Sequence, residues 1–159
     1  DHVLAELETS ATESPANFQL PLTAGRLGAS TSVWLFENPG VTEAAEEKAL
    51  RYVDASISSY RRAIETCDNH ALAHFELSRA LVYKGYISGD PEFFREALDT
   101  ADDAIRLEPR LFASHDLAVD IAASLIGDRR LALDRVDRAI LVNPAWRGGL
   151  MKHVREMDP

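Results

Sequence analysis

Hydrophobic residues recur every three or four positions along most of the chain from residue 42 onward. In TEAAEEKALRYVDASISSYRRAIE this spacing places the apolar side chains on one face of a helix. They are Ala45, Ala49, Tyr52, Val53, Ile57, Tyr60, Ala63 and Ile64. The segments ALAHFELSRALVYKG, PEFFREALDTADDAIRL, LFASHDLAVDIAASLIG and RRLALDRVDRAILV show the same period, and none alternates as a strand does. The pattern predicts an all-α fold.

Capping residues and glycines divide this pattern into helices. Thr42 is suited to cap the first long helix, and Asp90 and Asn143 each precede a proline that fits a first helical position. Gly85 and Gly127 stand where two helices are expected to end. On this reading YISGDPE belongs to an enlarged turn.

The N-terminal part has a different composition. Residues 1–21 are rich in Ser, Thr and Pro, which predicts a mostly irregular segment. TAGRLGASTSVWLFEN is compatible with a helix that ends before NPG. We expect VWLF, residues 33–36, to bury its apolar side chains against the first long helix.

One helix sequence occurs twice. ALDTADDAIRLEP, residues 97–109, and ALDRVDRAILVNP, residues 132–144, share seven of thirteen residues, including the final proline. A weaker copy, SISSYRRAIETCD, aligns its Ala63–Ile64 with Ala104–Ile105 and lacks the proline. Two-helix repeats of about 34 residues are typical of solenoids, because one hairpin cannot bury its own apolar face and must stack on a neighbour.

These residues make the chain similar to the tetratricopeptide repeat family. The likeness covers roughly residues 50–144 and rests on small residues in the second helix of each repeat, followed by proline. The matching positions are Ala97, Ala104 and Pro109, then Ala132, Ala139 and Pro144, with Tyr60 and Ala63 in the weaker copy. Asp120 and His74 depart from the family pattern, since a small residue and a large aromatic are expected there.

The resemblance implies a right-handed superhelical solenoid of about three helix hairpins with a C-terminal capping helix. The expected division is an irregular segment at 1–21, a repeat domain at 22–144 and a capping helix at 145–159. The hairpins are expected at approximately 22–68, 69–109 and 110–144. The first of them is inferred from the other two.

The composition limits the classes of partner that we expect this protein to bind. The net charge of −9, with no Lys/Arg cluster interleaved with aromatic residues, argues against nucleic-acid binding. Apolar runs are far shorter than the roughly 20 residues that a membrane helix needs, so we expect a soluble protein without a membrane span. Cys67 is the one cysteine, which excludes an internal disulfide and is compatible with a cytoplasmic location.

Two residue groups resemble catalytic or metal sites. Ser114, His115 and Asp116 are the residue types of a hydrolase triad, but consecutive side chains on a helix diverge by about 100°. The spacing of Cys67, His70 and His74 is compatible with metal ligation, yet no fourth ligand lies nearby in the sequence. With no phosphate-binding or dinucleotide motif either, we expect no enzyme activity, no cofactor and no metal.

The remaining candidate site is the concave face formed by the first helix of each repeat, which in this family holds peptides or protein segments. Spacing assigns it Leu72, Phe75, Arg79 and Tyr83 from one repeat and Leu117, Ile121 and Ser124 from the next. This surface suits an apolar or amphipathic segment with an occasional carboxylate, as expected of a protein-interaction or scaffold module.

Other interpretations stay open. The chain's own NFQLPL or VWLF is an alternative occupant of the groove, which would make it core. A second functional hypothesis is a regulatory or sensor module of a larger signalling protein that binds a small apolar ligand. A third is homo-oligomerisation through the turn around Phe93 and Phe94.

Overall fold

The computed structural model describes residues 2, 5–6, 9, 19–41 and 44–157, and these form helices joined by short turns. No strand occurs in these ranges, which confirms the all-α prediction. The α-helices are α2 (Gln19–Glu37), α3 (Ala45–Thr66), α4 (Ala71–Ser88), α5 (Glu92–Leu107), α6 (Phe112–Asp120), α7 (Arg129–Val142) and α8 (Arg147–Arg155). A π-helix, η1 (Ile121–Leu125), continues α6, and a 3₁₀ turn, η2 (Pro144–Trp146), precedes α8.

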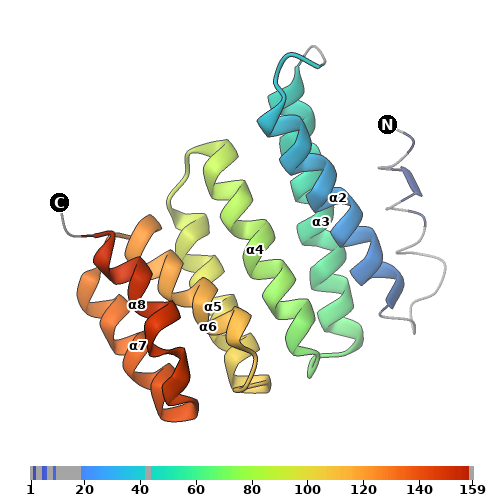
Figure 1. Ribbon diagram of the computed structural model, residues 1–159. Helices are drawn as coiled ribbons and strands as arrows, with labels where there is room; N and C mark the ends of the chain where they lie inside the picture. The colour runs from blue at the N-terminus through green and yellow to red at the C-terminus, as the bar shows by residue number, and fades with distance from the viewer. Residues whose placement is uncertain (1, 3–4, 7–8, 10–18, 42–43, 158–159) are drawn as a thin grey trace.

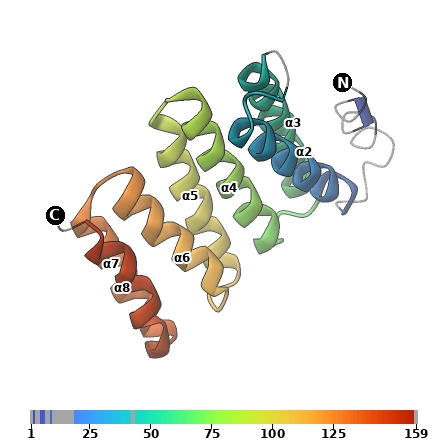
Figure 2. The ribbon, with the colours of Figure 1, turned by 45° about the horizontal axis from the view of Figure 1, so that its top comes forward.

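The helices stand in a row, each packed against the one before it and the one after it (Figure 1). The closest packing joins α2 to α3 and α4 to α5, and α3 contacts α4 between these pairs. In both views α2 and α8 lie at opposite ends of the row (Figure 2). None of the helices in the described ranges is long and apolar enough to cross a membrane.

Alanine lies at most of the close contacts between helices. Small side chains let helix axes approach, and the interior has no room there for a larger residue. The alanines that are 0–1% exposed are Ala49, Ala63, Ala73, Ala80, Ala97, Ala101, Ala104, Ala118, Ala122, Ala132 and Ala139. Larger buried side chains form one cluster that runs from α2 to α6 and a second among η1, α7 and α8.

The ends of α4 and α6 depend on glycine. The prediction that α4 ends at Gly85 is wrong: the helix continues to Ser88 and ends at Gly89, whose φ of 70° suits glycine. Gly85 is instead buried, and a Cβ there would lie 2.5 Å from the Phe94 ring. Gly127, with φ 74°, follows the end of the α6 and η1 helix as predicted.

Side-chain caps begin several helices. The predicted cap is confirmed at Asn143, whose side chain accepts from the Ala145 amide at the start of η2. The Asp90 carboxylate accepts from the Glu92 amide, but α5 begins at Glu92, so Pro91 and not Asp90 stands at the capping position. At α3 the residue before the helix is Ala44, with φ 56° and no side-chain cap, and Thr42 lies outside the described residues. Pro144 begins the 3₁₀ turn η2, so the α-helical part of the predicted C-terminal capping helix, α8, begins only at Arg147.

The first hairpin differs most from the prediction. Helix α2 includes residues 19–21, which were predicted to be irregular, and residues 2, 5–6 and 9 are also helical; the rest of 1–18 lies outside the described residues. Of VWLF, only Leu35 is buried, whereas Trp34 and Phe36 are exposed. The reason is geometric: α2 packs mainly on α3 and touches α4 much less, so a large part of its surface is not covered by another described helix.

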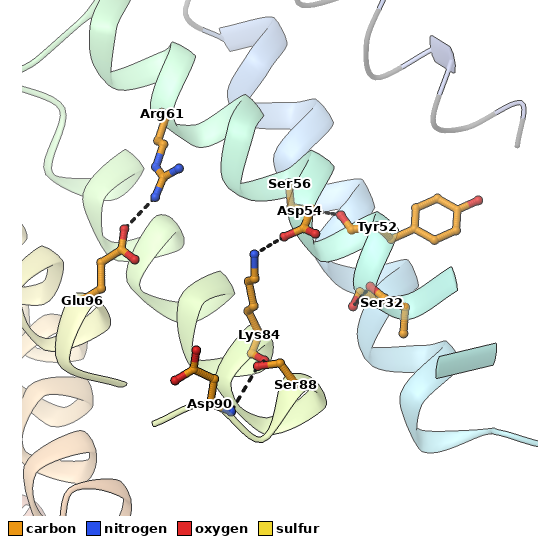
Figure 3. A network of polar contacts seen from close by, with 10 residues as sticks. Ser32, Tyr52, Asp54, Ser56, Arg61, Lys84, Ser88, Asp90 and Glu96 are labelled. Atoms are coloured by element: carbon orange, nitrogen blue, oxygen red, sulfur yellow. Dashed lines mark hydrogen bonds and ion pairs between the residues drawn. The ribbon is translucent and has the colours of Figure 1, made fainter. Parts of the chain in front are cut away.

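Polar contacts join the first two hairpins (Figure 3). Arg61 of α3 pairs with Glu96 of α5 at 2.6 Å, and Lys84 of α4 pairs with Asp54 of α3. Within the hairpins, buried serines bridge the helices: the hydroxyl of Ser32 donates to the carbonyl of Ala49 at 2.8 Å, and that of Ser78 to Ala97 at 2.7 Å. These bonds satisfy hydroxyls that would otherwise be costly to bury.

Candidate functional site

An open cavity of about 510 Å³ lies between α2 and α4, with α3 beneath it. Its walls are two helical stripes, because the lining residues recur at three- and four-residue steps on both helices. Helix α2 provides Arg26, Ala29, Ser30, Val33, Trp34 and Glu37, helix α4 provides Glu76, Arg79, Ala80 and Tyr83, and α3 provides Tyr60. We call this cavity the α2/α4 groove.

A charged cluster occupies one part of the α2/α4 groove. Arg26 Nε lies 3.0 Å from Glu76 Oε1, and Arg79 Nη1 lies 3.3 Å from Glu76 Oε2. Glu76 has a side chain only 12% exposed, whereas both arginines are close to half exposed. The cluster therefore carries one net positive charge and presents guanidinium groups to solvent around a shielded carboxylate.

Tyr60 forms the floor of the groove. It is 0% exposed, and its ring packs against Gly25, where a Cβ would lie 2.5 Å from Tyr60 Cε1. Its hydroxyl group has no hydrogen-bond partner in the described part of the protein. Burial, and then the negative charge of Glu76, raises the pKa of this hydroxyl far above its usual value, and the nearby arginines offset this only in part. Tyr60 is thus a neutral donor at physiological pH.

Aromatic residues form the other part of the groove. Trp34 is 51% exposed, an unusual exposure for so large an apolar side chain, and Val33 lies next to it. Across the groove the Tyr83 hydroxyl lies 3.4 Å from Arg79 Nη2, and the Arg79 guanidinium lies 5.8 Å from the centre of the Phe75 ring. This part offers stacking and apolar contact beside the charged cluster.

The sequence matches no known family model and no curated protein. The function of the groove therefore has to be inferred from its own residues.

The structure brings together only part of the predicted site. Arg79 and Tyr83 line the α2/α4 groove, and Phe75 contacts Arg79 beside it. Leu72 is half-buried and does not line the groove.

The residues predicted from the next repeat lie elsewhere. Ile121 is 0% exposed in the core, which corrects its assignment to a binding surface. Ile121 still follows Leu117 at α-helical spacing, and it is buried because neighbouring helices cover this face of α6. The π-helical turn that begins at Ile121 changes the direction of the side chains after it, such as Ser124. Leu117 packs against the core, and the Ser124 hydroxyl donates to Asp120 at 2.8 Å.

The groove residues of α2 and the floor residue Tyr60 were missed. A signal for them exists in the sequence: positions 26, 29–30, 33–34 and 37 follow the helical period, as do 76, 79–80 and 83 in α4. The prediction assigned VWLF to the core and so did not treat α2 as a wall of the site. VWLF does not fill the groove, because Val33 and Trp34 form its wall. Of NFQLPL, residues 19–22 belong to α2 and do not line the groove, and residues 17–18 lie outside the described residues.

The other candidate groups have structural contacts. His115 Nε2 lies 2.9 Å from the Pro109 carbonyl, and Asp116 pairs with His153, so the two do not form a relay with Ser114. Near the start of α4, His70 accepts from the Ala73 amide, and His74 Nε2 lies 3.2 Å from the Asp68 carbonyl.

A smaller cavity of about 250 Å³ lies among α5, α6 and α7. Three arginines line it, and each is paired with an aspartate: Arg106 with Asp103, Arg135 with Asp102, and Arg138 with Asp134.

The aromatic residues Phe93 and Phe94, which were assigned to an oligomer contact, make contacts within the chain. The Phe94 ring packs edge-on against Tyr86, and Lys84 Nζ lies 4.5 Å from the centre of the Phe93 ring.

Proposed function

We propose that the chain is a tetratricopeptide-like solenoid with a right-handed superhelical course. Its hairpins would be α2 with α3, α4 with α5, and α6 and η1 with α7, capped by α8. Equivalent residues support this register: Ala104 follows Ala63 by 41 positions, and Ala139 follows Ala104 by 35. His74 and His115, also 41 positions apart, each contact the carbonyl six residues earlier.

The departures from a 34-residue period have visible structural causes. Helix α4 continues to Ser88, three residues past Gly85, which accounts for three of the seven residues by which the 41-residue spacing exceeds the family period. The 35-residue repeat is one residue longer than the family period and contains the π-helix η1. One inserted residue in a helix is what a π-turn accommodates.

The function proposed for this solenoid is protein binding without catalysis. The observation that carries it is the α2/α4 groove, which lies between the first helices of two successive hairpins and has a half-exposed Trp34 in its wall. Exposed aromatic side chains beside arginine are typical of surfaces that recognise peptides. The occupant would be a protein or peptide segment.

The lining favours a peptide over the other candidate ligand, a small apolar molecule. Four of the eleven lining residues are charged, and an apolar molecule would leave Glu76 and the two arginines desolvated without compensation.

The charged cluster also does not favour catalysis. The negative charge of Glu76 is balanced by two arginines that hydrogen-bond to it, and a carboxylate bound in this way is not suited to act as a general base.

Filling the groove tests this function. Ser30 is exposed in the groove wall and Ser58 is exposed on α3 outside the groove, so Ser30→Trp and Ser58→Trp form a matched pair. Peptides selected on the wild-type chain from a random displayed library are expected to lose at least about tenfold in affinity for Ser30→Trp and none for Ser58→Trp. Equal affinity for both variants, at unchanged helicity by circular dichroism, would exclude the groove as the binding surface.

A further inference from the structure

The Tyr60 hydroxyl is a buried donor directed at the α2/α4 groove, and it makes no hydrogen bond to the described residues. Buried hydroxyl groups in proteins are nearly always hydrogen-bonded, because losing water without a replacement costs free energy. Tyr60 lines the groove and is 0% exposed. Because the hydroxyl oxygen itself has no exposed surface, an acceptor that enters the groove would satisfy this donor once the neighbouring side chains move aside.

The charged residues around Tyr60 indicate which charge a ligand group bound there should carry. Glu76 accepts from one nitrogen of Arg26 and from one nitrogen of Arg79. A guanidinium group has five N–H donors, so donors remain on both arginines after these bonds and the bond from Arg79 to Tyr83. The cluster has one positive charge in excess and an added hydroxyl donor, which together match one anionic acceptor.

A carboxylate fits these donors better than a phosphate. A planar carboxylate matches the fork of a guanidinium group and brings one negative charge, equal to the excess on the cluster. A phosphate brings nearly two, against a groove that also contains Glu37 and a chain of net charge −9. The same net charge disfavours polyanions in general.

The distance to the aromatic part of the groove sets a spacing. Helices α2 and α4 run in the same direction (Figure 1). Arg26 of α2 pairs with Glu76 of α4, and Val33, Trp34 and Tyr83 come seven or eight residues later on the two helices. Arg26 is seven or eight residues before Val33 and Trp34, about 11 Å along a helix at roughly 1.5 Å per residue. An extended peptide covers that distance in about three or four residues.

We propose that the α2/α4 groove recognises a peptide segment by one acidic side chain and one large apolar side chain about three or four positions away from it. The acidic carboxylate binds Arg26, Arg79 and the Tyr60 hydroxyl, and the apolar side chain packs on Trp34. The source of the carboxylate is a side chain within the segment. Both helices extend beyond the cluster, α2 from Gln19 and α4 from Ala71, so a bound chain can run past it. This inference rests on the proposed function.

The test uses short peptides with an acetylated N-terminus and an amidated C-terminus, each carrying one glutamate and one phenylalanine at separations from one to six positions. Affinities are measured by NMR titration of the ¹⁵N-labelled chain. We expect separations of three and four to bind most tightly, and replacement of the glutamate by glutamine to weaken them about tenfold.

Tyr60→Phe gives the decisive protein variant. It removes only the unpaired hydroxyl, so the thermal midpoint should stay equal or rise while affinity for the glutamate peptide falls about tenfold. Affinity for the glutamine peptide should change much less, which a merely structural role of Tyr60 would not produce. Tyr52→Phe, in the core outside the groove, is the matched control and should leave both affinities unchanged.

The outcomes separate this inference from the proposed function. Glutamate and glutamine peptides of equal affinity, with binding still lost in Ser30→Trp, would overturn the carboxylate recognition and leave the groove as a peptide site. The same peptides with a free C-terminal carboxylate test the source of the carboxylate: binding of these and not of the amidated peptides would overturn the assignment to a side chain. Peptide binding that is unaffected by Ser30→Trp would remove the proposed function together with this inference.

Discussion

Gly25→Ala tests the contact that shapes both the first hairpin and the groove floor. In an unhindered helix this change stabilises, because alanine exceeds glycine in helix propensity by about 0.8–1.0 kcal/mol. At position 25 the new Cβ would lie 2.5, 2.7 and 2.8 Å from three atoms of the Tyr60 ring. Unstrained carbon atoms lie at about 3.5–4.0 Å, so the ring or α2 must move by about 1 Å.

Tyr60 has little room to move, because it is 0% exposed. Overpacking of this kind costs about 1–3 kcal/mol, and a fully enclosed ring favours the upper end. After the gain in propensity, we expect the free energy of unfolding to fall by about 2 kcal/mol. For a chain of this size that corresponds to a thermal midpoint about 4–8 °C lower.

Thermal and urea unfolding followed by circular dichroism measure this change, and Gly148→Ala is the matched control. Gly148 lies in α8, and a Cβ there would meet no atom of the described residues beyond its own helix within 4 Å, so alanine should stabilise by up to about 1 kcal/mol. In a Tyr60→Leu background, Gly25→Ala should lose its cost. A Gly25→Ala chain as stable as Gly148→Ala would refute the close approach of Tyr60 to α2.

Two further predictions concern titration and the C-terminal cap. Burial raises the pKa of Tyr60 in the folded state, so above pH 10 the unfolded chain releases a proton that the folded chain keeps, and stability should fall by up to about 1.4 kcal/mol per pH unit. This part of the slope should vanish in Tyr60→Phe, and identical alkaline slopes would contradict it. His153, which lies 2.9 Å from Asp116 and 3.1 Å from Asp120, joins α8 to α6. His153→Ala should cost about 1–3 kcal/mol and speed amide exchange in α8, whereas the exposed Lys152→Ala should cost less than about 1 kcal/mol. Equal effects would show that the contacts of His153 with the two aspartates do not hold α8 in place.

Much of the helical framework is local in origin, and the sequence predicted it. The period of the apolar residues specified the helices from Ala45 onward, and the side chains of Asp90 and Asn143 accept hydrogen bonds from amides two residues later. The repeated alanines marked where helices cross closely, since Ala97, Ala104 and Ala132 are all 0% exposed. Such features depend on side chains within a few residues of each other, so a linear pattern contains them.

The groove was decided by tertiary structure, because periodicity shows that a residue lies on an apolar face but not which neighbour covers that face. Ile121 and Trp34 both follow the helical period, yet the first is enclosed between helices and the second lies in the open groove between α2 and α4. A glycine such as Gly85 is typical of a helix end, yet it lies inside α4, which ends at Gly89. The tertiary structure explains it, because the Phe94 ring packs against Gly85 and leaves no room for a Cβ. The surroundings of the Tyr60 hydroxyl also depend on tertiary structure, because α2 and α4 bring charged residues to it from distant parts of the chain. Arg26 lies 34 positions before Tyr60, and Glu76 and Arg79 lie 16 and 19 positions after it.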